Sequence, residues 1–216
     1  REKKRLKKSR KISSISGWFL VALLVAFLLY TIYSLASLMS LMEDIRTHPV
    51  QVLFAGGELQ SDIDNVRISF EQLKNINTPE VVEDVRKQIQ VIYEDAQQQL
   101  DVIEERFLGD AKEVEKLGEL MEQMQADQAA FLSYAAAADR SEEEIVSYSS
   151  EHLDQVNEEF DRQLEKILDY ADARLNDFYQ EAGRTSFNSI LISCFVFAAV
   201  LGVYFLYRHL LNRNTV

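Results

Sequence analysis

The sequence predicts an all-α protein, with an antiparallel, up-down four-helix bundle outside the membrane flanked by two transmembrane helices. Glycine (7) and proline (2) are scarce among the 216 residues, which favours long helices over sandwiches and loop-rich folds. Residues 12–42 and 185–207 are uncharged and mostly apolar, and each stretch is long enough to cross a bilayer, which takes roughly 20 apolar residues. Between them, apolar residues recur every three or four positions, the period of amphipathic helices.

The charge distribution predicts how the chain crosses the membrane. Residues 1–11 hold eight basic residues and one acidic residue, whereas residues 43–184 hold 34 acidic and 13 basic residues, a net charge of −21. Basic residues beside apolar helices stay on the cytoplasmic side, so we expect both termini in the cytoplasm and residues 43–184 outside. A basic cluster also fits nucleic acid or anionic lipid. Next to an apolar stretch, topology and lipid contact are the favoured interpretation, and we predict no nucleic-acid partner.

These features divide the chain into five parts. We expect a basic cytoplasmic N-terminus at residues 1–13, a first transmembrane helix at 14–40, an extracytoplasmic bundle with a membrane-proximal stalk at 41–184, a second transmembrane helix at 185–207 and a short cytoplasmic tail at 208–216. A soluble core helix would rarely stay uncharged over such lengths. The lone Cys194 is interpreted as a small apolar residue of the second membrane helix, and a single cysteine excludes an internal disulfide.

Turn signals divide the outer segment into helices. Thr78 precedes Pro79 as an N-cap with proline at the first helical position, Gly109 ends the next helix, and Ser141 with Glu144 forms a capping box. We expect helices at residues 50–76, 79–107 and 110–138, and a fourth that runs from 141 into the second apolar stretch. An even number of antiparallel helices returns the chain to the membrane. The apolar seams are expected at Leu59, Ile63, Val66, Phe70 and Leu73; at Val82, Val85, Ile89, Ile92, Ala96, Leu100, Ile103 and Phe107; and at Val114, Leu117, Met121, Met124, Gln128, Phe131 and Ala135.

The fourth helix differs from the others in its period. Its apolar residues repeat every eleven positions, which predicts a straight or slightly right-handed helix. Its membrane-proximal end is expected to pair with residues 35–45 as a two-helix stalk, through Leu35, Leu38, Met42 and Ile45. At the top of this stalk, Pro49 lacks a backbone donor and disfavours helix at His48. We therefore predict a hinge at His48 and Pro49. The residues spaced eleven positions apart are Leu153, Leu164 and Leu175; Val156, Ile167 and Phe178; and Phe160, Ala171 and Ala182.

Residues 48–63, "HPVQVLFAGGELQSDI", and 105–110, "ERFLGD", carry a family resemblance. They resemble the extracytoplasmic four-helix-bundle sensor domains of bacterial chemoreceptors, sensor histidine kinases of two-component systems and membrane diguanylate cyclases. The family's Met-His-Arg triplet falls on Val66, Arg67 and Ile68. The resemblance implies a ligand- or stress-sensing input module in the bacterial inner membrane that acts as a homodimer and drives a cytoplasmic output domain beyond this sequence. The matching residues of the first segment are His48, Pro49, Val52, Ala55, Asp62 and Ile63.

The sequence predicts no catalytic residues, no cofactor and no metal site. Gly56-Gly57 lacks the lysine and hydroxyl residue of a phosphate loop, and the three histidines are scattered, without zinc-ligand spacing. The abundant carboxylates are interpreted as a solvated surface rather than acid–base pairs or a cation site, although such a surface attracts cationic ligands at long range. We therefore expect no enzyme activity in these residues.

Three polar residues are the candidates for binding a small-molecule ligand. Gln128 lies on an otherwise apolar seam, Arg67 flanks another, and Tyr134 lies near the membrane-distal end. The alternative for Gln128 is a core polar group that sets helix register, and for Arg67 a surface or interhelical ion pair. The expected function is signal input, transmitted through the second membrane helix by changes in helix packing. The alternative is a membrane-anchored extracytoplasmic scaffold without signalling output.

Overall fold

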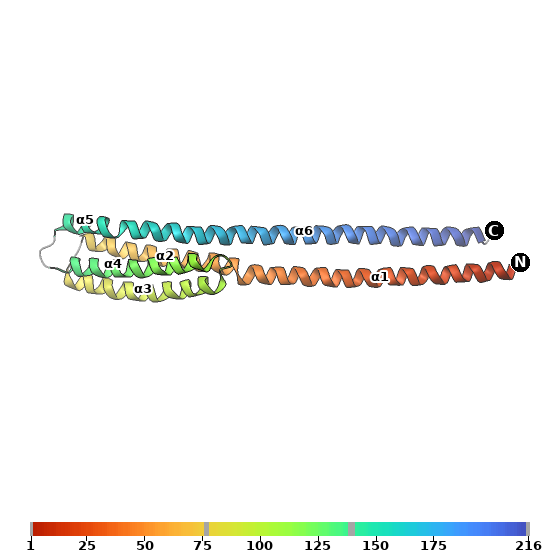
Figure 1. Cartoon of the computed structure of the whole chain (residues 1–216), viewed down its shortest axis with the longest axis horizontal. Helices are drawn as coiled ribbons and strands as arrows, with labels where there is room; N and C mark the ends of the chain where they lie inside the picture. The colour runs from red at the N-terminus through yellow and green to blue at the C-terminus, as the bar shows by residue number, and fades with distance from the viewer. Residues whose placement is uncertain (1, 76–77, 138–140, 215–216) are drawn as a thin grey trace. The chain divides into compact units, whose positions relative to one another are not determined.

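The computed structural model describes residues 2–75, 78–137 and 141–214, and over these residues it contains helices and no strand. The chain divides into two compact units. We call residues 44–177 the core unit, and the residues up to Glu43 together with those from Phe178 onward the apolar unit. Figure 1 labels the helices, which are α1 (Glu2–Thr47), α2 (Pro49–Asn75), α3 (Pro79–Arg106), α4 (Ala111–Ala135), α5 (Glu142–His152) and α6 (Asp154–Asn214).

In the core unit, α2, α3, α4, α5 and the first part of α6 bury their apolar residues in one hydrophobic core. The predicted seams of α2 and α4 are confirmed, since every residue named for them is buried. The α3 seam needs a correction. Tyr93 is buried and Ile92 is only half-buried, and the Tyr93 hydroxyl finds a hydrogen-bond partner on α4 in Gln128. Phe107, named for the same seam, lies one residue beyond α3 and is half-buried.

Two helix starts follow the predicted capping chemistry. Val81 N–H donates to Thr78 Oγ1 at 3.4 Å, and Ser141 with Glu144 forms the reciprocal capping box. A third cap was not predicted: Lys112 N–H donates to Asp110 Oδ1 at 3.1 Å. Gly109 has a different role from the left-handed helix end that glycine usually provides. Its φ lies outside the left-handed region, and a Cβ there would stand 2.5 Å from the Phe107 ring. Gly109 therefore provides space in a turn.

The prediction of one helix from residue 141 into the second apolar stretch is wrong at Leu153. Helix α5 ends at His152 and α6 begins at Asp154, with φ −103° and ψ −31° at Leu153. The His152 ring stacks on Tyr148, and its Nδ1 lies 3.0 Å from Tyr148 O, the carbonyl that the His152 backbone N–H binds in an unbroken helix. The break contains neither glycine nor proline, and Leu153 N–H still donates to Ser149 O at 2.8 Å across it. From Asp154 onward the helix is continuous, as predicted.

The α1–α2 junction coincides with the predicted hinge at His48 and Pro49. Helix α1 ends at Thr47 and α2 begins at Pro49. Val52 N–H still donates to His48 O at 3.1 Å, but proline has no N–H for the preceding turn. His48 Nδ1 lies 3.3 Å from Arg106 O, and Pro49 is buried. The junction thus packs against the α3–α4 turn, and its movement stays a prediction.

In the apolar unit, α1 and α6 contact each other through small and polar side chains. Ser34 Oγ lies 2.5 Å from Ser189 Oγ, and Ser34 is buried. Ser189 donates its only proton to Thr185 O at 2.8 Å, so Ser34 is the donor to Ser189. The predicted stalk face is wrong in two positions: Leu35 and Met42 are exposed, because Ser34, Leu38 and Leu41 hold the inward positions.

Two helices are long and apolar enough to cross a membrane, one within Leu20–Leu73 and the other within Asp154–Leu206. Their most apolar windows are 6% and 0% buried within the structure. Large apolar side chains within these two ranges are exposed, among them Tyr33 at 72% and Phe195 at 75%. In this respect the two helices differ from the core helices of a soluble protein, whose apolar windows are mostly buried.

The adjacent glycines of α2 provide a matched test of core packing. A Cβ at Gly56 would clash with Leu168 Cδ2, whereas a Cβ at Gly57 would meet nothing within 4 Å. We expect Gly57→Ala to raise the free energy of unfolding by about 0.5–1 kcal/mol through helix propensity. Gly56→Ala should gain less or lose about 1 kcal/mol, because Leu168 must move. Thermal unfolding of the full chain in detergent, followed by circular dichroism, measures both; equal gains would contradict the Gly56–Leu168 contact.

Candidate ligand-binding site

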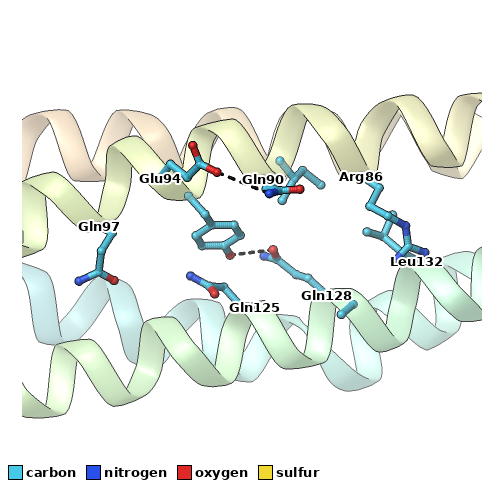
Figure 2. Close-up of a pocket in the computed structure, with 10 residues that line it drawn as sticks. Arg86, Gln90, Glu94, Gln97, Gln125, Gln128 and Leu132 are labelled. Atoms are coloured by element: carbon cyan, nitrogen blue, oxygen red, sulfur yellow. Dashed lines mark hydrogen bonds between the residues drawn. The ribbon is translucent and has the colours of Figure 1, made fainter.

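A groove between α3 and α4 is the candidate site. It has a volume of about 390 Å³, and Figure 2 shows polar side chains of both helices along it. Four of its residues are glutamines, two from each helix. The lining comprises Arg86, Ile89, Gln90, Tyr93, Glu94 and Gln97 of α3, and Gln125, Gln128, Ala129 and Leu132 of α4.

Tyr93 and Gln128 form a buried hydrogen-bonded pair in this groove. Tyr93 is 8% exposed and Gln128 is 3% exposed, and the Tyr93 hydroxyl donates to Gln128 Oε1 at 2.7 Å (Figure 2). Burial raises the Tyr93 pKa well above its usual value, and the hydrogen bond to Gln128 and the charge of Arg67 offset only part of the rise. Tyr93 therefore remains a donor at physiological pH. It holds the Gln128 carboxamide in one orientation, with Oε1 occupied and the NH2 group left for another acceptor.

Arg67 does not line the groove. Its guanidinium contacts Asp64 Oδ1 at 3.1 Å on its own helix and Asp161 Oδ1 at 2.7 Å on α6, and it donates to Asn157 O at 3.4 Å. These are the contacts of the interhelical ion pair that the sequence left open as the alternative. The Arg67 Nε and Asn157 Oδ1 atoms are buried without a hydrogen-bond partner.

Tyr134 belongs to a separate aromatic cluster. Its ring stacks on Tyr148 with centroids 4.2 Å apart, and Tyr148 stacks on His152 at 4.0 Å. Of the three predicted ligand contacts, only Gln128 lines the groove; their roles in binding stay predictions. Sequence reasoning missed Tyr93 and Gln125. Tyr93 has helical spacing, four residues after Ile89 and three before Ala96, but Ile92 fits the same period, so spacing alone does not identify the tyrosine. Gln125 is half-buried beside the Met124 seam position and gives no sequence signal of its own.

A second polar contact that the sequence did not predict joins α4 to α6. The buried Gln163 donates from Nε2 to Glu113 O at 2.7 Å and to Glu113 Oε2 at 2.9 Å. Lys166 Nζ lies 2.7 Å from Glu113 Oε1. The hydrogen bonds from Lys166 and Gln163 lower the pKa of Glu113. This cluster is held by internal partners, so it offers less to a ligand than the groove does.

No protein-family model, no curated protein and no solved structure matches the chain. The fold and the groove therefore define an all-helical protein with two helices long and apolar enough to cross a membrane. The resemblance to bacterial sensor domains stays a prediction.

A double-mutant cycle tests the Tyr93–Gln128 pair. Tyr93→Phe leaves Gln128 Oε1 buried without its donor, and Gln128→Leu leaves the Tyr93 hydroxyl without its acceptor. Each single change should lower the free energy of unfolding by about 1–3 kcal/mol. The double variant should be less destabilised than the sum by about 1 kcal/mol or more, because no orphaned group remains. Urea unfolding of the full chain measures the four proteins, and additive effects would contradict a direct bond.

Asp62 provides a test of stability against pH. Burial, followed by repulsion from Asp95 and Glu58, raises the pKa of Asp62. A carboxyl whose folded-state pKa lies above its unfolded-state pKa destabilises the fold when it is ionised, and the penalty disappears as pH falls through the folded-state pKa. Asp62→Asn should therefore raise the melting temperature at pH 7, and the gain should vanish in acid. Melting curves from pH 7 down to pH 3 check this, with Asp101→Asn, an exposed residue of α3, as the control. A gain that persists in acid would contradict it.

Proposed function

We propose that the chain is the input module of a bacterial transmembrane receptor. In this proposal, α2, α3, α4 and the α5–α6 segment are the four helices of an extracytoplasmic bundle. A ligand or stress changes their packing, and α6 carries the change through the inner membrane to a cytoplasmic output domain. The observation that supports it best is the continuity of α6 from Asp154 to Asn214. One helix carries both core residues such as Phe160 and Leu164 and the exposed apolar residues that follow.

The exposed apolar surface supports the membrane part of this proposal. Soluble proteins rarely expose large contiguous apolar patches, yet residues such as Phe195 and Phe197 are 75% and 66% exposed. Lipid would cover them. The basic segment before the first apolar stretch and the net negative charge of residues 43–184 support cytoplasmic termini.

The α2 surface supports a partner for the core unit. Phe54 and Ile68 lie fourteen residues apart on α2 and are 68% and 58% exposed, so they recur on one helix face. We include a homodimer in the proposal, with this face as its candidate contact. The same surface is the observation that favours the second candidate function, an extracytoplasmic scaffold without signalling output.

A chimeric receptor tests the function. The chain is joined after residue 216 to the output domain of a membrane diguanylate cyclase, and Pro49→Ala is compared with Pro79→Ala, the only other proline. Pro49 is buried at the α1–α2 junction and Pro79 is exposed at the start of α3. We expect Pro49→Ala to change cyclase output by about fivefold or more, the scale of typical coupling between sites. Pro79→Ala should leave it unchanged.

The same cells report the topology. In a Cys194→Ala background, an impermeant maleimide should label Asp101→Cys in intact spheroplasts and label Ser9→Cys only after lysis. If both cysteines, at positions 9 and 101, are labelled in the same compartment, the receptor proposal is overturned. Correct topology with an output that neither proline change affects would leave the scaffold as the better interpretation.

A further inference from the structure

The α3–α4 groove has a cationic end and carboxamide walls. Figure 2 shows Arg86 beside Leu132 at one end and Gln97 at the other, with Gln125 and Gln128 between them. Carboxamides both donate and accept hydrogen bonds, so they match groups that do the same, above all peptide bonds. An arginine matches a carboxylate, because its planar fork can bind both oxygens.

The two charged groups that line the groove, Arg86 and Glu94, are available to a ligand. The Arg86 guanidinium contacts Glu83 through Nε, at 3.5 Å from Glu83 Oε2. The Arg86 side chain is 44% exposed and the Glu83 side chain is 55% exposed. Such a surface pair contributes little and is readily exchanged. Gln90 Nε2 donates a hydrogen bond to Glu94 Oε1 at 3.5 Å, and this long, exposed bond is also readily exchanged. Gln128, by contrast, is fixed by Tyr93, so its NH2 group is preoriented within the groove.

The spacing of these groups selects the size of the ligand. Arg86 and Glu94 lie eight residues apart on α3, about 12 Å at 1.5 Å per residue. Three to four extended residues span about 10–14 Å, whereas the ammonium and carboxylate of a single α-amino acid share one carbon and cannot reach both ends. A zwitterion also carries no net charge, so the net charge of −21 on residues 43–184 does not repel it as it would repel a phosphate or a dicarboxylate.

We propose that this groove binds short linear peptides of about three residues through their free termini and backbone. Arg86 receives the carboxylate, Gln128 and Gln125 bind the peptide bonds, and Glu94 receives the ammonium group. This inference rests on the proposed function in one respect: peptide binding would be the stimulus that changes α3–α4 packing.

Isothermal titration of the full chain in lipid nanodiscs tests the proposal. The probes are tri-L-alanine, tri-L-alanine amide, which lacks the carboxylate, and free L-alanine. We expect tri-L-alanine to bind and the other two to bind at least about tenfold more weakly, since the charge-assisted bond to Arg86 is lost or the second end is out of reach.

Arg86→Gln and Lys87→Gln provide the matched variants. Both remove one positive charge beside Glu83, but Lys87 does not line the groove. Arg86→Gln should weaken tri-L-alanine binding about tenfold or more and abolish the preference over the amide. Lys87→Gln should change neither. Circular dichroism confirms that both variants remain helical.

Three results would overturn the proposal: no tri-L-alanine binding at millimolar concentration, equal binding of the amide, or equal losses in Arg86→Gln and Lys87→Gln. Its failure is distinct from that of the receptor. If tri-L-alanine binds but labelling places the termini and residue 101 in one compartment, the receptor proposal fails and the peptide-site proposal stands. If the topology is as expected and Pro49→Ala changes the output, but tri-L-alanine does not bind, only the peptide-site proposal fails.

Discussion

The common burial of one apolar stripe from each helix is the constraint on which the core unit depends. No helix can hide such a stripe alone, so α2, α3, α4 and the first part of α6 must share one core. A buried polar group is costly there unless it is hydrogen-bonded. Gln163 is satisfied by Glu113, Ser69 by Asn65 O and Gln128 by Tyr93. Of these three buried residues, only Gln128 also lines the groove between α3 and α4.

The sequence predicted what depends on local period and capping chemistry. The seams of α2 and α4, the Thr78 and Ser141 caps and the continuity of α6 beyond Asp154 follow from residue spacing, which is independent of the neighbouring helices. The choice between Ile92 and Tyr93 could not be predicted this way. Both positions fit a helical face, and the partner Gln128 across the groove favours the tyrosine.

Two further features escaped prediction. The α5–α6 break lies in a segment without glycine or proline, next to His152, whose ring stacks on Tyr148 and contacts a backbone carbonyl. Arg67 and Tyr134 proved to lie outside the groove because periodicity identifies a polar residue beside a seam but not the helix that it faces. Arg67 faces α6, where Asp161 receives it.

The same contacts bear on how α6 could move. In the core unit, α6 is tied to α2 and α4 by Arg67–Asp161 and Lys166–Glu113. These partly exposed ion pairs resist displacement weakly. In the apolar unit the Ser34–Ser189 hydrogen bond is 2.5 Å long, and O–H···O bonds lose their geometry beyond about 3 Å. A slide of α6 by about 2 Å along its axis, the upper end of helix shifts in switching proteins, would lengthen this bond beyond about 3 Å if α1 stayed in place. If lipid surrounds these helices, as we propose, an orphaned hydroxyl there would be costly, and the bond would then favour a movement in which α1 and α6 shift together.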